Sequence, residues 1–361
     1  MTPATRTRAI ACSAALGLLA VGCTSNPRSS ASPRRVAPTT AAATTTSATT
    51  TTPPVVVPVL RPPTVPTTGA YFGIWRGPGP GRSPDDTTSL HAAQDAIGRH
   101  FAIVHHYYEW GAPVPTAAES DAAAAGAIPM VSICACHFGS QSVVRWARIA
   151  AGTDDAYLST IARSFAAATT PMFLVFDAEP ETNMPSRGTA ADYVAAWRHV
   201  VAVFRAEHAS NVAFVWATTT WAFTSGSDAT ARAMAAYPGD DVVDWIGADA
   251  YNYFDHGVWN TFANTIAPWY SWASGAHPHK PLMLPEWGTK EDRRSPGRKA
   301  AWITDAGHLL ATTFSAVHAV VYFDERKVEH ATVNDWRIDT SPSAQQAFAV
   351  LGTQPWFANQ P

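Results

Sequence analysis

The chain has 361 residues, with 25 Lys and Arg against 28 Asp and Glu, and its formal net charge of −3 excludes electrostatic binding of nucleic acid or of an anionic membrane. Hydrophobic residues make up 47% of the chain and charged residues 15%, which excludes disorder over its whole length. Proline and threonine are concentrated in the first seventy residues. We therefore expect one globular domain of about 290 residues after them.

The amino terminus is typical of an export signal. Arg6 and Arg8 precede an apolar stretch, Ala9 to Val21, that is shorter than a membrane span requires. The stretch ends in LLAVGC, which resembles a bacterial lipobox and would make Cys23 the site of lipidation. We predict a signal over residues 1–23 and an exported protein, either a lipoprotein of the cell envelope or a secreted protein cut nearby. The membrane is then a partner only through a lipid at Cys23.

Residues 24–68 consist mainly of Ser, Thr, Pro and Ala, and include the run TTTTPP. Proline stiffens such a segment and threonine keeps it solvated. We predict a disordered linker that holds a domain over residues 69–361 away from a membrane or wall.

Short apolar runs alternate with amphipathic stretches throughout that domain, as buried parallel strands alternate with helices. One helix is predicted to begin after Thr189, because Asp192 completes a capping pair, and another spans about 296–314. Eight strand–helix alternations predict a single (β/α)8 barrel. No glycine-rich first turn of an open doubly wound sheet is present. The eight apolar runs cover residues 70–77, 102–110, 128–136, 172–179, 212–218, 242–252, 281–288 and 316–325.

The ends of these runs are acidic and aromatic. Barrel enzymes carry their chemistry at the carboxyl ends of the strands, and an ionised carboxylate in an apolar strand end is costly unless it is paired or used. Glu179 and Glu286 close runs four and seven, which lie nearly opposite each other in an eight-stranded barrel. Two facing carboxylates suit glycoside hydrolysis, and aromatic rings suit sugar binding. The other acidic and aromatic residues selected here are Asp177, Asp249, Trp75, Trp110, Trp221 and Trp287.

The domain from about residue 71 to residue 357 resembles glycoside hydrolase family 26, in the large clan of barrel glycosidases, and is similar to its actinobacterial branch. The resemblance implies that Glu179 is the general acid/base and Glu286 the nucleophile, that Tyr251 hydrogen-bonds the nucleophile, and that Trp216 lines a sugar subsite. It rests on the segments ARIAAGTDDAYLSTIA, FLVFDAEPETNM, GTAADYVAAWRHVVAVFR, NVAFVWA, DWIGADAYN, KPLMLPEWG, YFDERK and DWRIDTSPSAQQAF.

The implied activity is retaining hydrolysis of a β-linked polysaccharide or oligosaccharide by a monomer. β-Mannan is the first candidate, with β-glucan and β-xylan behind it, and no metal or cofactor is required. The family has His before the acid/base, whereas this chain has Ala178. Loss of that donor leaves open a second interpretation, a catalytically weakened barrel that binds carbohydrate, unless Asp177 or Glu181 compensates. Alternation along the strand would place Asp177 on the same face as Glu179.

A metal-dependent hydrolase is a third interpretation, with His105, His106 and His137 as its ligands. It is disfavoured because His105 and His106 are adjacent and must point to opposite faces of a strand. Cys134 and Cys136 supply too few ligands for a structural zinc site, so we expect buried thiols or a local disulfide.

Overall fold

The computed structural model describes residues 60–77, 87–224, 226–254, 257–329 and 332–359. The predicted signal over residues 1–23, Cys23 within it and most of the predicted linker lie outside these residues. In the part of the chain that is described, no helix is both long and apolar enough to cross a membrane.

Eight parallel strands close into a barrel in the order in which they occur along the chain, which confirms the predicted (β/α)8 fold. Strand β8 pairs with β1 over six residues, from Tyr71 opposite Ala319 to Arg76 opposite Asp324, so the sheet has no free edge. The strands are β1 (Tyr71–Arg76), β2 (Ile103–Tyr108), β3 (Ile128–Ile133), β4 (Met172–Phe176), β5 (Val212–Thr219), β6 (Trp245–Asn252), β7 (Leu282–Thr289) and β8 (Val317–Asp324).

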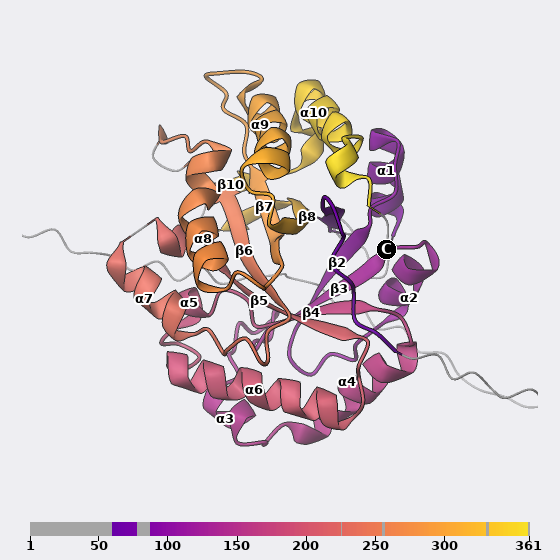
Figure 1. Ribbon diagram of the computed structural model, residues 1–361, viewed down its shortest axis with the longest axis vertical. Coiled ribbons are helices and arrows are strands. Elements are labelled where there is room, and N and C mark those ends of the chain that lie inside the picture. The colour runs from indigo at the N-terminus through magenta and orange to yellow at the C-terminus, as the bar shows by residue number, and fades with distance from the viewer. Residues whose placement is uncertain (1–59, 78–86, 225, 255–256, 330–331, 360–361) are drawn as a thin grey trace, which may run out of the picture. The chain divides into compact units, whose positions relative to one another are not determined.

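Helices surround the barrel, as Figure 1 shows. A short antiparallel hairpin of β9 (Arg326–Glu329) and β10 (Thr332–Asp335) follows β8. The helices are α1 (Thr88–Ile97), α2 (Ala117–Ala124), α3 (Trp146–Ala150), α4 (Asp155–Ala168), α5 (Pro180–Asn183), α6 (Ala190–Ala206), α7 (Ser227–Ala235), α8 (Phe262–Ala276), α9 (Arg298–Thr312) and α10 (Pro342–Gly352).

Side chains alternate between the inside of the barrel and the layer beneath the helices, as the strand period of two requires. On β5, Ala213, Val215 and Ala217 belong to the inner cluster, whereas Phe214 and Trp216 belong to the larger outer core. The direction in which a strand residue points therefore depends on its parity along the strand.

Strand β7 interrupts this alternation with a bulge. Three steps on β6, from Gly247 to Ala250, match four steps on β7, from Met283 to Trp287. One extra residue is inserted near Glu286, and such an insertion shifts the side chains that follow it by one position. As a result Trp287 lies in the outer core, while Glu286 contacts residues on the inner faces of β2 and β6.

The predicted start of α6 is confirmed. The Asp192 amide donates to Thr189 Oγ1 at 3.2 Å, and the Thr189 amide donates to Asp192 Oδ2 at 2.9 Å, so two amides at the helix start are satisfied reciprocally. The helix predicted over 296–314 corresponds to α9.

Replacing the capping residue should destabilise the protein without changing its fold. Thr189→Ala removes the acceptor for the Asp192 amide and is expected to lower the free energy of unfolding by about 1 kcal/mol in urea denaturation. Thr160→Ala is the matched control, because this exposed hydroxyl in the middle of α4 donates only to the Ala156 carbonyl. Equal losses from both variants would contradict a capping role.

Candidate active site

The Glu286 carboxylate accepts a hydrogen bond at each of its oxygens. Tyr107 Oη, from β2, donates to Oε1 at 2.8 Å, and Tyr251 Oη, from β6, donates to Oε2 at 2.7 Å. Burial raises the pKa of Tyr251 well above its ordinary value, and the nearby charge of Glu286 adds to this, so the hydroxyl stays protonated and able to donate. The two hydrogen bonds, from different strands, fix the plane of the carboxylate. The contact between Tyr251 and Glu286 that the sequence resemblance implied is therefore present.

Tyr107 is a residue that the sequence analysis did not select. It lies two positions after His105, and His105 bonds to Ser132 of β3, so both β2 side chains point to the inside of the barrel. The parity of β2 could have identified Tyr107 from the sequence. A phenol on the inner face, near the carboxyl end of a strand, is placed to contact a carboxylate at the barrel mouth.

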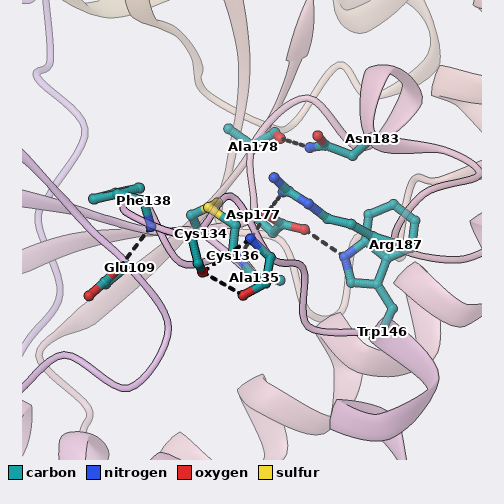
Figure 2. Close-up of a disulfide and its surroundings, with 12 residues drawn as sticks. Glu109, Cys134, Ala135, Cys136, Phe138, Trp146, Asp177, Ala178, Asn183 and Arg187 are labelled. Atoms are coloured by element: carbon teal, nitrogen blue, oxygen red, sulfur yellow. Dashed lines mark hydrogen bonds and ion pairs between the residues drawn. A yellow bond between two sulfur atoms is a disulfide. The ribbon is translucent and has the colours of Figure 1, made fainter. Parts of the chain in front are cut away.

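Glu179 follows β4 and caps the short helix α5. Its backbone is left-handed, with φ 55° and ψ 50°, a conformation that non-glycine residues adopt at a cost. The Glu179 amide donates to the Ala217 carbonyl of β5 at 2.9 Å, and the Glu179 carbonyl accepts from Thr182 Oγ1 at 2.9 Å. Asn183 Nδ2 donates to the Ala178 carbonyl at 3.0 Å (Figure 2). These bonds hold the turn that presents Glu179.

Asp177 begins this turn, but its side chain does not lie on the same face as Glu179, where alternation along the strand would place it. Its φ of 46° is also left-handed, so the strand geometry ends before it. Asp177 Oδ1 accepts from the Ala135 amide at 2.9 Å and pairs with Arg187, and Oδ2 accepts from Trp146 Nε1 at 2.6 Å (Figure 2). The residue is 1% exposed. Asp177 thus anchors the turn to β3, α3 and the segment after α5, and it does not compensate for Ala178 from the same face as Glu179.

Glu181 is the second residue of α5 and is buried, and its carboxylate faces the end of β5. Oε1 accepts from both the amide and the hydroxyl of Thr219, at 2.7 and 2.8 Å. Burial raises the pKa of Glu181 above its ordinary value, against the opposing effect of the Thr219 bonds. Glu181 therefore ties the turn that carries Glu179 to the neighbouring strand.

Cys134 and Cys136 form a disulfide just after β3, which confirms one of the two predicted states (Figure 2). The Cys134 amide donates to the Tyr108 carbonyl and the Trp110 amide to the Cys136 carbonyl, both at 2.9 Å. The covalent loop encloses Ala135, whose amide bonds to Asp177. The disulfide thus closes the segment against which the Glu179 turn is anchored.

Three of the selected tryptophans are buried in the outer core. Trp216 and Trp287 are fully buried and Trp110 is 6% exposed. Trp216 packs against Trp272 of α8, and Trp287 stacks on Trp302 of α9. Parity on β5 and the bulge on β7 turn the rings of Trp216 and Trp287 toward the helices, and Trp110 packs against Tyr157 of α4. The structure does not bring these rings to the barrel mouth.

Two of the other selected residues, Asp249 and Trp75, lie nearer the inner face. Asp249 lies two positions before Tyr251 on β6 and is 3% exposed. It contributes to the raised pKa of Tyr251, but less than burial and Glu286 do. Trp75 Nε1 donates to Glu325 Oε2 at 2.8 Å, and its ring lies 5.0 Å from that of Tyr107. Trp221 follows β5 and is 52% exposed.

The histidines of β2 face opposite sides, as predicted. His105 bonds to Ser132 inside the barrel, whereas His106 Nδ1 lies 2.8 Å from Glu119 Oε1 on the α2 side. In the described ranges, no group of three His, Cys, Asp or Glu side chains could hold a metal ion.

Solved structures share this arrangement of strands and helices. A family 26 β-mannanase from Bacteroides ovatus superposes with a TM-score of 0.55 and 16% identity, over 80% of this chain and 90% of that one. An endo-β-1,4-mannanase from Cellulomonas fimi gives a TM-score of 0.57 and 18% identity, over 80% and 71%. This chain has the fold of glycoside hydrolase family 26. The predicted resemblance to family 26 is confirmed at that level.

Sequence similarity extends to a curated protein. The chain is 28% identical over 300 residues to endoglucanase H of Acetivibrio thermocellus, covering 78% of this chain. It spans only 30% of the length of that relative. No protein-family model matches the chain.

The buried pair of Asp177 and Arg187 should be important for stability. Arg187→Met leaves the Asp177 carboxylate buried without its cation and is expected to lower the free energy of unfolding by about 3–5 kcal/mol. Arg148→Met, which breaks an exposed ion pair with Asp154, is the matched control and should change little. If urea denaturation showed equally small losses in the free energy of unfolding for Arg187→Met and Arg148→Met, the result would contradict the anchoring role.

Glu181 should make stability depend on pH. A raised pKa in the folded state means that the folded protein binds more protons than the unfolded chain, so the stabilisation is full below the unfolded pKa of about 4.3 and is lost as the pH rises. Glu181→Gln cannot ionise but keeps a carbonyl oxygen for Thr219. Its stability relative to the parent should therefore increase from pH 4 to pH 8 in urea denaturation, and a constant difference would contradict this.

Proposed function

We propose that this chain is an exported retaining glycoside hydrolase that cleaves β-linked polysaccharide, with Glu179 as the acid/base and Glu286 as the nucleophile. The observation that carries the proposal is the Glu286 carboxylate, which accepts one tyrosine hydroxyl at each oxygen. A carboxylate fixed in one plane is oriented for nucleophilic attack. The turn bearing Glu179 is held on the adjoining strand ends by Asp177 and Glu181.

In the first step, an oxygen of Glu286 attacks the anomeric carbon while the bond to the leaving oxygen breaks. Glu179 donates its proton to that oxygen, and a glycosyl ester forms at Glu286. In the second step Glu179 takes a proton from water, whose oxygen attacks the anomeric carbon and displaces Glu286. Configuration is retained because each step inverts it.

The comparisons support the proposed substrate class. Endoglucanase H is named for glucan and the two mannanases for β-mannan. We propose β-mannan first, with β-glucan and β-xylan behind it. Trp75 and the exposed Trp221 are the tryptophans proposed to contact sugar in place of the buried ones. No metal or cofactor takes part.

One observation favours the second candidate, a weakened barrel that binds carbohydrate. Ala178 packs against the inner apolar cluster, and its methyl group can offer no hydrogen bond to a sugar hydroxyl. Asp177 is engaged elsewhere, so the missing donor is not replaced from that position.

We further propose that the protein acts outside the cytoplasm, as a lipoprotein anchored at Cys23 or as a secreted monomer of the actinobacterial branch. The export signal and the linker support this location. The Cys134–Cys136 disulfide supports it independently, because disulfides persist in oxidising compartments.

The test is hydrolysis of soluble β-mannan, β-glucan and β-xylan by the full chain beside Glu179→Gln and Glu286→Gln. We expect reducing ends from the parent, a loss of about 10²–10⁴-fold for Glu179→Gln because general acid catalysis is removed, and no activity for Glu286→Gln. A 2,4-dinitrophenyl glycoside separates the roles, because its leaving group departs without a proton. The glycosylation step of Glu179→Gln should remain close to parental on that substrate.

Glu207→Gln is the matched control, since this carboxylate pairs with Arg163 on the outer surface and should leave activity unchanged. Product configuration is read by proton NMR at early times. Inversion, or unchanged activity in Glu286→Gln, would contradict the mechanism. If the folded parent hydrolysed none of the polymers but still bound sugar, the result would favour the second candidate, a weakened barrel that binds carbohydrate.

A further inference from the structure

A chain of hydrogen bonds crosses the inside of the barrel from β3 to Glu286. Ser132 Oγ lies 2.8 Å from His105 Nε2, His105 Nδ1 lies 3.1 Å from Tyr107 Oη, and Tyr107 Oη lies 2.8 Å from Glu286 Oε1. His105 is 1% exposed. Its ring also lies against that of Tyr107, with centroids 4.2 Å apart.

The direction of each bond follows from counting protons. A carboxylate can only accept, so the single hydroxyl proton of Tyr107 is donated to Glu286. His105 Nδ1 must then carry a proton and donate to the Tyr107 oxygen. In a neutral imidazole the other nitrogen is bare, so Nε2 accepts from the hydroxyl of Ser132.

The ring is neutral under ordinary conditions. Burial lowers the pKa of His105 to about 3, and the neighbouring His106 acts in the same direction, against the raising effects of the Pro285 carbonyl and Glu119. A neutral ring exists as one of two tautomers, and the one with its proton on Nε2 would turn Nδ1 into an acceptor. Tyr107 could then donate to His105 and leave Oε1 of Glu286 without this bond.

We propose that His105 is a positioning residue for the nucleophile: by donating from Nδ1 to Tyr107, it directs the tyrosine proton onto Glu286. The hydroxyl of Ser132 accommodates this tautomer by donating to Nε2. The assignment rests on the proposed function, because it concerns the residue to which that function gives the nucleophilic role. In this role His105 acts through Tyr107 and need not touch the substrate.

The test is a double-mutant cycle on the full chain. His105→Leu and Tyr107→Phe should each lower kcat/KM by about 10- to 100-fold, the range for losing a hydrogen bond to a charged group. The double variant should be no slower than Tyr107→Phe alone, because both changes remove one pathway. His105→Asn, which keeps an amide N–H close to the position of Nδ1, should recover most of the activity.

The loss in kcat/KM should be equal on a polymer and on a 2,4-dinitrophenyl glycoside, because a defect in the nucleophile does not depend on the leaving group. A variant that disturbed Glu179 instead would lose activity on the polymer but keep it on the 2,4-dinitrophenyl glycoside. His318→Leu is the control variant, since this half-buried β8 histidine bonds the Gly69 carbonyl at the other end of the barrel. The proposal would be overturned if the fold-losses in kcat/KM of the two single variants multiplied in the double variant.

A second readout does not require activity. Nitrogen-15 NMR of the His105 ring should show a proton on Nδ1 and a bare Nε2 in the parent, and the same state in Glu207→Gln. A parent ring with its proton on Nε2 would overturn the proposal even in an active enzyme, whereas the Nδ1 tautomer in an inactive parent would mean that the proposed function alone had failed.

Discussion

Closure of the eight-stranded sheet is the constraint on which the rest of the structure depends. Because β8 pairs with β1, every strand is hydrogen-bonded on both edges, and each side chain must lie either inside the barrel or beneath the helices. All eight strands also run in the same direction, so their carboxyl ends meet at one mouth. Residues as distant in sequence as Tyr107 and Glu286 thereby come within hydrogen-bonding distance.

The site lies where this regularity is interrupted. An extra residue in β7 allows Glu286 to face inward while the next residue, Trp287, packs outward. After β4, the left-handed residues Asp177 and Glu179, on either side of Ala178, replace the extended backbone. Each interruption is held by groups from neighbouring elements, so its cost is offset by contacts that only the closed barrel provides.

The sequence allowed prediction of the eight strands, because long apolar runs are the strongest local signal, and it located both glutamates at strand ends. It also predicted the capping pair of α6. It could not give the direction of Trp287, since a bulge is invisible in the order of residues and reverses parity beyond it. The resemblance placed Trp216 at a sugar subsite, but its parity on β5 directs the ring toward the helices, where it is fully buried.

The left-handed backbone at Glu179 has a consequence for how this chain can change. Glycine adopts that conformation without strain, so the residue that best suits the turn is one that cannot transfer a proton. Selection for thermal stability alone would tend to remove the carboxylate, and selection for turnover would retain it. In the proposed enzyme, position 179 is therefore a site of trade-off, where a more robust protein and a more active one require different residues.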